Sequence, residues 1–238
     1  MNIAFIPVRG GSKSVPLKNI KNIYGKPLVY WAVNAAQHSK VIDKVVVATD
    51  HIGIKNTVLS FGFNKVEVYD REPINAQDTS PTMDVILEYI EKENINDEDI
   101  MFLIQATSPL IEPTHIDDMY EKMLKENSQS ALTCVECKRF FWTKNGKPIN
   151  YDYKVRIRRQ DFEGYMMENG ACYINSIFNL KTTKNLLKEP ITVYSMPEYT
   201  ATELDEELDF FIIEKLFEKY KRPDQTRPDQ TRPDQTRP

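Results

Sequence analysis

Short apolar runs alternate with amphipathic stretches through the first half of the chain. The apolar runs are rich in β-branched residues and end at turn-forming residues, which is typical of buried strands. They cover residues 2–8, 44–48, 65–69 and 100–104. Apolar side chains recur at helical spacing over residues 27–38, in a stretch that ends at Leu59, behind Ser80-Pro81, and over residues 113–125. Strands that alternate with helices indicate parallel pairing through right-handed crossovers, so we expect an α/β fold with a Rossmann-like, mostly parallel sheet flanked by helices.

Three of the loops that follow these strands are rich in polar residues. Open parallel sheets bind ligands beyond the carboxyl ends of their strands. The loops to consider are therefore residues 9–19, 49–51 and 105–109. We also expect Ser80 to cap the helix behind it, with Pro81 at the first helical position.

The pattern changes after Ser130. Residues 131–135 and 170–175 are strand-like, and residues 205–220 form a last amphipathic helix. Between the two strands, aromatic and basic residues mix with turn signals, which predicts a small insertion over residues 138–168 that serves as a dimer contact. The sequence RPDQT occurs three times over residues 222–238. Such a proline-rich, apolar-poor stretch buries no face, so we expect one domain over residues 1–221 and a disordered tail.

Composition narrows the class of protein. The 238 residues carry a formal net charge of −4, which argues against a general nucleic-acid binder. No apolar stretch approaches the ~20 residues of a membrane span, and the N-terminus lacks the pattern of a secretory signal. Three cysteines cannot all pair within the chain, which fits a reducing compartment. We expect a cytoplasmic protein without a membrane or nucleic-acid partner.

The loop after the first strand has the chemistry of an anion site. Its sequence over residues 8–19 is VRGGSKSVPLKN. Glycines let the backbone approach a ligand closely, and Arg9, Lys13 and Lys18 can neutralise phosphate oxygens. The spacing matches neither GxxxxGK[ST] nor GxGxxG, which argues against a P-loop NTPase and a dinucleotide oxidoreductase. A plain surface loop with solvated lysines is the alternative.

Carboxylates gather around the start of the predicted last helix. They are Glu203, Asp205, Glu206, Glu207 and Asp209. Acidic residues at a helix start complement its dipole, and Asp205 could simply be the N-cap. Metal binding is the other reading of the same residues.

The cysteines and histidines do not indicate a metal site. Cys134 and Cys137 lack a second CxxC pair, so we interpret them as buried and structural. His38, His51 and His115 have no ligand spacing, and we expect His51 to lie in a solvent-facing loop.

Taken in order, the motifs resemble those of the acylneuraminate cytidylyltransferases, the CMP-sialic acid synthetases. RGGSK is followed by Pro16, Lys18 and Asn19, as in the family's first motif. Further segments resemble the family's VATD strand end, its R…DT segment, its Q-x-TSPL motif, its RRQD…ENG pair and its acidic motif. They are residues 47–50, Arg71 with residues 78–79, residues 105–110, residues 158–161 with 168–170, and residues 203–210. The resemblance covers about residues 3–215 and excludes the tail.

The resemblance implies a role for each matching residue. CTP would lie across Arg9, Gly10, Gly11, Ser12, Lys18 and Asn19, with Arg71 and Ser80 near the cytosine. Arg9 and Lys18 would be the catalytic cations that hold the triphosphate and stabilise the leaving pyrophosphate. Gln105, Asn169 and Tyr173 would face the sugar. Asp205 and Glu203 would hold Mg²⁺, because a triphosphate normally arrives with that ion.

The implied reaction joins CTP and a nonulosonic acid to give CMP-sugar and pyrophosphate, in a homodimer. Three positions depart from the family pattern. Ser14 stands where glycine is frequent, Glu203 where some members have aspartate, and Met167-Glu168 where some bacterial members have arginine. No residue stands out as a general base.

Two other readings remain open. A cytidylyltransferase for another sugar acid, such as 3-deoxy-manno-octulosonate, should lack the RRQD and ENG segments. A non-catalytic nucleotide-binding module need not retain Arg9, Lys18 and Asp205.

Overall fold

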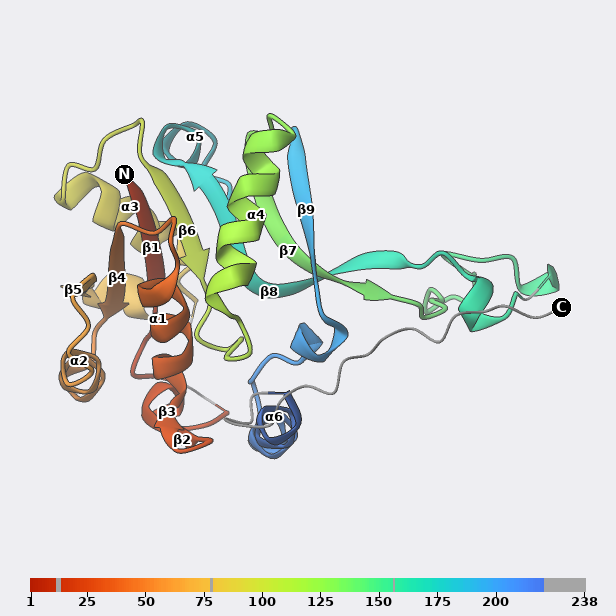
Figure 1. Ribbon diagram of the computed structural model, residues 1–238, viewed down its shortest axis with the longest axis horizontal. Coiled ribbons are helices and arrows are strands. Elements are labelled where there is room, and N and C mark those ends of the chain that lie inside the picture. The colour runs from red at the N-terminus through yellow and green to blue at the C-terminus, as the bar shows by residue number, and fades with distance from the viewer. Residues whose placement is uncertain (12–13, 78, 156, 221–238) are drawn as a thin grey trace, which may run out of the picture.

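A seven-stranded sheet in the order β5-β4-β1-β6-β8-β7-β9 forms the centre of the molecule (Figure 1). The structure is a computed structural model, and it describes residues 1–11, 14–77, 79–155 and 157–220. The strands are β1 (Asn2–Pro7), β4 (Lys44–Thr49), β5 (Val66–Asp70), β6 (Ile100–Ile104), β7 (Ser130–Cys137), β8 (Tyr165–Ser176) and β9 (Ile191–Met196). Strands β2 (Asn22–Ile23) and β3 (Lys26–Pro27) pair separately.

The predicted parallel sheet is confirmed, with one reversed strand. β1 pairs in parallel with β4 and β6, and β4 with β5. β9 is likewise parallel to β7. β8 runs antiparallel to both of its neighbours, β6 and β7. The carboxyl ends of β1, β4, β5 and β6 therefore share one edge, and β8 approaches that edge with its amino-terminal half.

Helices cover both faces of the sheet. Helices α1 (Leu28–His38), α2 (Ile52–Leu59) and α4 (Pro113–Lys125) bury their apolar stripes in one core. Helices α3 (Thr82–Lys92) and α5 (Ile177–Thr183) pack on the opposite face. Helix α6 (Glu207–Tyr220) packs with the β2–β3 hairpin in a third cluster. Short 3₁₀ turns are η1 (Lys18–Ile20), η2 (Pro73–Ala76), η3 (Tyr153–Val155), η4 (Arg159–Asp161) and η5 (Glu198–Ala201).

Several local predictions were wrong. The N-cap of α3 is Pro81 rather than Ser80, and the Ser80 hydroxyl donates a hydrogen bond to the Ile74 carbonyl at 2.7 Å. The alternative reading of Asp205 as an N-cap is not supported, because its side chain instead accepts from Lys18 and α6 begins at Glu207. Asp209, in the first turn of α6, accepts from the backbone N–H groups of Asp205 and Glu206 at 2.8 and 2.7 Å. The His51 ring does not simply face solvent, because it is half-buried and caps α2 by accepting from the Gly53 N–H.

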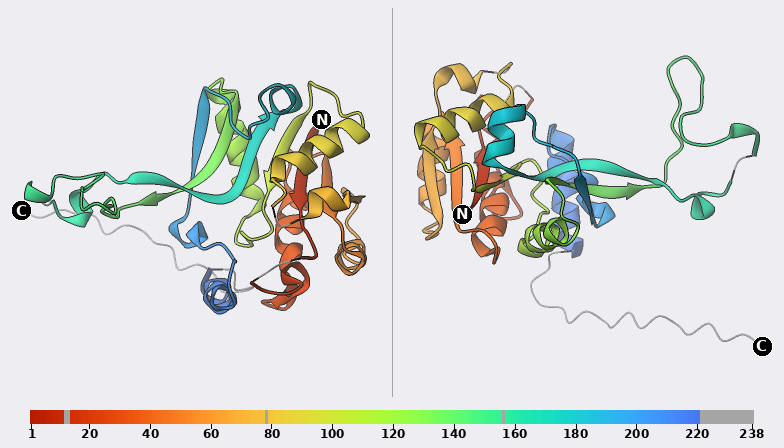
Figure 2. Two further views of the ribbon diagram at one scale, coloured as in Figure 1. Left: turned by 180° about the vertical axis from the view of Figure 1, so that it is seen from behind. Right: turned by 90° about the horizontal axis from the view of Figure 1, so that it is seen from above.

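The predicted insertion forms an arm that extends away from the sheet (Figure 2). β7 and β8 run out together, and residues 138–164 connect their far ends. The boundary differs from the prediction, since β8 already begins at Tyr165. The expected disorder of residues 222–238 concerns positions outside the described residues.

Candidate active site

A cavity of about 210 Å³ opens at the carboxyl ends of β1 and β6. The parallel pairing of these two strands brings the first loop beside the loop after β6. The residues around the cavity come from the end of β1, from these two loops and from the start of α3. They are Pro7, Arg9, Lys18, Asn19, Thr82, Gln105, Ala106 and Thr107. Three predicted site residues from the first loop and one from the loop after β6 thus line a single cavity.

The first loop is fastened to its neighbours by backbone contacts. The Gly10 N–H donates to Asp50 Oδ1 at 2.9 Å, and the buried Asn19 amide donates to the Arg9 carbonyl at 3.1 Å. A Cβ on Gly10 would lie 2.7 Å from His51 Cβ, so this position requires glycine. Gly11 is exposed, with open space where a Cβ would stand. Ser12 lies outside the described residues.

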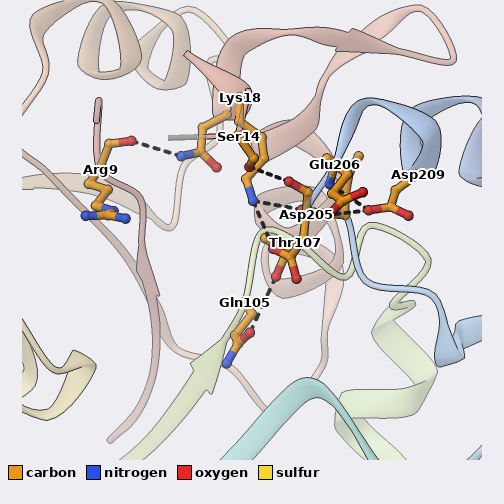
Figure 3. Close-up of polar contacts among 10 residues, drawn as sticks. Arg9, Ser14, Lys18, Gln105, Thr107, Asp205, Glu206 and Asp209 are labelled. Carbon is orange, nitrogen blue, oxygen red and sulfur yellow. Dashed lines mark hydrogen bonds and ion pairs between the residues drawn. The ribbon is translucent and has the colours of Figure 1, made fainter. Parts of the chain in front are cut away.

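Lys18 points into the cavity and contacts the acidic segment before α6 (Figure 3). Its ammonium donates to the Leu204 carbonyl at 2.8 Å and to Asp205 Oδ1 at 3.2 Å. The Ser14 hydroxyl donates to the Asp205 carbonyl. The Leu204 N–H donates to the Thr107 carbonyl at 2.8 Å. These bonds hold the acidic segment against both cavity loops.

Glu203 packs on the backbone of Gly170. A Cβ at Gly170 would come within 3.0 Å of the Glu203 carboxyl carbon, and the positive φ of 65° also favours glycine. Burial raises the pKa of Glu203, and the neighbouring Asp205 raises it further, while Lys18 acts in the opposite direction. Glu203 and Asp205 therefore lie close enough to interact electrostatically.

This pair is chemically suited to Mg²⁺. The ion prefers oxygen ligands and is commonly held by one or two carboxylates together with substrate phosphates. The Asp205 side chain is 70% exposed, so it remains accessible although Lys18 contacts one of its oxygens. Within the described ranges no group of three acidic, histidine or cysteine side chains could hold a metal without a substrate.

Arg71 lies beside the first loop but is buried. It is 8% exposed, and its Nε has no hydrogen-bond partner among the residues that the structure describes. Burial lowers the pKa of its guanidinium, while Asp50 and Glu88 raise it and Arg9 lowers it. Arg71, Asp50 and Arg9 thus form one electrostatic group.

The residues predicted to face the sugar differ in their surroundings. Gln105 lines the cavity, and its side-chain oxygen accepts from the Thr107 hydroxyl at 3.4 Å. Asn169 is buried, and its amide donates to the Thr200 hydroxyl at 3.2 Å, so in this conformation it supports η5 instead of facing the cavity. The Tyr173 hydroxyl donates to Glu168 at 3.0 Å, and burial, followed by Glu168, raises its pKa.

Some residues at the site were missed by sequence reasoning. Thr82 and Thr107 line the cavity, and Asp50 fixes Gly10. Asp50 and Thr107 lie within loops that the strand pattern had singled out, so their positions, although not their contacts, could have been found.

A glycine-bearing loop with two cations, a cavity at the carboxyl edge of a parallel sheet and an adjoining carboxylate pair define a nucleotide-handling α/β protein. The profile of the Cytidylyltransferase family matches residues 3–231. The chain belongs to the cytidylyltransferase family.

Known relatives share this assignment. N-acylneuraminate cytidylyltransferase A of Danio rerio is 34% identical over 89% of this chain and 50% of its own length. Pseudaminic acid cytidylyltransferase of Campylobacter jejuni is 26% identical over 88% of this chain and 94% of its own. The chain spans about half the length of the first of these relatives.

The fold is also shared with a solved structure. A CMP:2-keto-3-deoxy-manno-octonic acid synthetase complexed with CTP superposes with a TM-score of 0.65 at 17% identity, covering 92% of this chain and 98% of that one. Among the described residues, no helix has the length and apolar content to span a membrane.

Proposed function

We propose that the protein joins CTP and a nonulosonic, sialic-type acid to give CMP-sugar and pyrophosphate. The observation that carries this proposal is the cavity in which Arg9, Lys18 and Asn19 face Gln105, in a chain of the cytidylyltransferase family. The names of the relatives in fish and Campylobacter support a nine-carbon acid. The RRQD and ENG segments favour it over the eight-carbon alternative.

Positioning and charge neutralisation carry the mechanism. Arg9, Lys18 and the glycines of the first loop would bind the triphosphate, and Asn19, with Arg71 and Ser80 nearby, would recognise the cytosine. The anomeric hydroxyl oxygen forms a bond to the α-phosphorus, and the bond from that phosphorus to the β-phosphate oxygen breaks. The hydroxyl proton passes to water, and pyrophosphate leaves. The two cations stabilise the charge that develops on the leaving group.

Asp205, with Glu203 beside it, would hold Mg²⁺. When bound, the ion neutralises phosphate charge. Asp205 contacts Lys18, so the carboxylate lies next to the cation assigned to the triphosphate. Gln105 and Tyr173 would contact the sugar, and Asn169 would support that side of the site from within the protein.

We also propose that the protein is a homodimer that assembles through the arm. Phe140, Tyr151 and Phe162 pack together within it, with ring centroids 4.3 and 5.1 Å apart. Other apolar side chains of the arm stay exposed, including Trp142, Ile149 and Val155 at 45, 62 and 71%. Such a surface is typical of an interface between protein chains.

Light scattering tests the proposed dimer. We expect Val155→Glu to reduce the measured molecular mass of the protein, whereas Ile52→Glu on α2 should not. A monomeric wild type would contradict this proposal.

We also propose a cytoplasmic location. Cys134, Cys137 and Cys172 are all buried and unpaired, which fits a reducing compartment. Localisation of a tagged full-length chain would test this, and a secreted protein would contradict it.

A pyrophosphate-release assay with CTP and Mg²⁺ tests the reaction. The acceptor panel should contain N-acetylneuraminate, legionaminate, pseudaminate and 3-deoxy-manno-octulosonate. We expect release with at least one of the nine-carbon acids and not with the eight-carbon acid. Release with the eight-carbon acid alone would establish the alternative. CTP binding without release by any acid would favour the non-catalytic module.

A further inference from the structure

Glu88 is a buried carboxylate outside the cavity. It lies on α3, is 9% exposed and accepts three hydrogen bonds. The Tyr69 hydroxyl and the Glu72 N–H donate to Oε1 at 2.7 and 2.9 Å, and the Asn75 amide donates to Oε2 at 2.6 Å. All three donors belong to residues 69–75, the end of β5 and the loop behind it. One side chain of α3 therefore fastens this whole segment.

The fastened segment carries Arg71. The Arg71 N–H donates to the Thr49 carbonyl at 3.1 Å, which places the residue at the end of β4. Its buried Nε lacks a hydrogen-bond partner among the described residues. Two carboxylates, Asp50 and Glu88, act on the guanidinium favourably.

Asp50 extends this arrangement to the first loop. Its Oδ1 accepts from the Gly10 N–H at 2.9 Å. Glu88 and Asp50 therefore both lie near enough to Arg71 to act on its charge, and Asp50 is hydrogen-bonded to the loop assigned to the nucleotide. The other neighbour of Glu88 is Lys92, at 3.8 Å and 44% exposed, which as a surface pair contributes little.

We infer that Glu88 is a positioning residue for the nucleotide site: it fixes residues 69–75 so that the Arg71 guanidinium stands beside Asp50 and the first loop. The inference rests on the proposed function, because it takes CTP as the ligand. It assigns Glu88 no contact with the substrates.

Titration calorimetry with CTP and Mg²⁺, without a sugar acid, tests the inference on the full chain. Glu88→Gln keeps the shape and an acceptor oxygen but removes the charge. We expect the CTP dissociation constant to rise about tenfold, the effect of weakening a cluster of hydrogen bonds to a charged group. The turnover number at saturating CTP should change less than about twofold, because a positioning effect on binding leaves the chemical step intact. Glu91→Gln, an exposed acid on the same helix, is the matched control and should bind CTP as the wild type does.

A double-mutant cycle with Arg71→Met separates positioning from a general loss of stability. If Glu88 acts through Arg71, Glu88→Gln should have no further effect on CTP binding in the Arg71→Met background. Additive effects, or unchanged CTP binding in a folded Glu88→Gln variant, would overturn the inference.

If Glu88→Gln does not fold, Tyr69→Phe removes only one of the three donors and should weaken CTP binding about threefold. Unchanged binding in that variant would likewise overturn it. A wild type that binds no CTP would instead refute the proposed function, and a failure confined to the variants would refute only the role of Glu88.

Discussion

The ammonium group of Lys18 lies 3.2 Å from a carboxylate oxygen of Asp205, a residue 187 positions further along the chain. The contact joins the cation assigned to the triphosphate with the carboxylate assigned to the metal. Each partly neutralises the other when no substrate is bound. Binding of the nucleotide and its metal ion would replace this ion pair with new pairs, of Lys18 with phosphate and of Asp205 with the metal. Without substrate, the pair reduces the electrostatic repulsion that each group would otherwise meet from its like-charged neighbours.

Replacing Lys18 should remove transition-state stabilisation. We expect Lys18→Met to lower kcat/KM about 100-fold or more, as the loss of a preorganised charge at a developing anion does. Steady-state pyrophosphate release measures this change. Lys21→Met is the control, since Lys21 pairs with the exposed Glu207 at 3.1 Å and such pairs contribute little. Equal activities of the two variants would contradict the role of Lys18.

Asp205→Ala should abolish turnover and leave folding intact. The side chain is 70% exposed, so its loss should change the free energy of unfolding by no more than about 1 kcal/mol. Activity should be measured across a magnesium titration, and urea unfolding reports stability. Glu214→Gln, an exposed acid on α6, should retain full activity. Full activity of Asp205→Ala would remove the metal assignment.

The Ser14 hydroxyl donates to the Asp205 carbonyl, and glycine cannot make this bond. Ser14→Gly should raise the KM for CTP about fivefold, the value of one net hydrogen bond, with little change in kcat. Ser14→Thr keeps a hydroxyl and should stay near the wild type. If both variants behave alike, the hydroxyl has no part in positioning the acidic segment.

The buried cysteines should resist alkylation. Burial, followed by the charge of Glu168, raises the pKa of Cys134 to about 11, and burial raises that of Cys172 as well. A raised thiol pKa favours the protonated form, so at pH 8 only roughly 0.1% of Cys134 would be the reactive thiolate. Mass spectrometry after iodoacetamide treatment should find both residues unlabelled in the folded protein and labelled in urea. Rapid labelling of the folded chain would show that this core opens readily.

Glu88 should make stability depend on pH in a defined direction. Burial alone would raise its pKa, but the hydrogen bonds from Asn75, Tyr69 and Glu72 and the charge of Lys92 bring it below its ordinary value. A carboxylate with a lowered pKa stabilises the fold above its ordinary value of about 4.5, and that contribution is lost as the pH falls through the folded-state pKa. The difference in unfolding free energy between wild type and Glu88→Gln, from urea titrations, should therefore be constant near neutral pH and shrink below about pH 4.5. A difference that grows on acidification would contradict this assignment.

Local sequence patterns located the part of the site that lies on parallel strands. Apolar runs of β-branched residues end at Arg9, Asp50 and Gln105, and a parallel sheet brings such ends to one edge. The first loop, the loop after β4 and the loop after β6 could therefore be predicted to meet, whereas the segment before α6 was assigned to the site only through the family resemblance. Their contacts could not, because the bond from Lys18 to the Leu204 carbonyl uses a backbone atom whose position is set by packing across the whole chain.

Other features had a weak local signal. α5 and β9 follow β8, which runs antiparallel to β6. The alternation of strands and helices in the sequence predicts parallel neighbours only, so it did not predict this part of the sheet. Ser80-Pro81 has the composition of a helix start, yet the Ser80 hydroxyl is bonded to Ile74 instead. Asn169 belongs to a recognisable segment, but only the tertiary structure reveals that its amide is taken up by Thr200.

The register between β7 and β8 has a consequence for how the site can change. β7 advances two residues, from Leu132 to Cys134, while β8 covers five, from Tyr173 to Glu168. β8 therefore carries three more residues than its partner in this stretch, which includes Gly170, the residue against which Glu203 packs. The position of Gly170 relative to β7 thus depends on how many residues β8 has here, which a substitution does not change. Insertions and deletions in this strand, more than point mutations, would be the events that reshape the acidic side of the site during evolution.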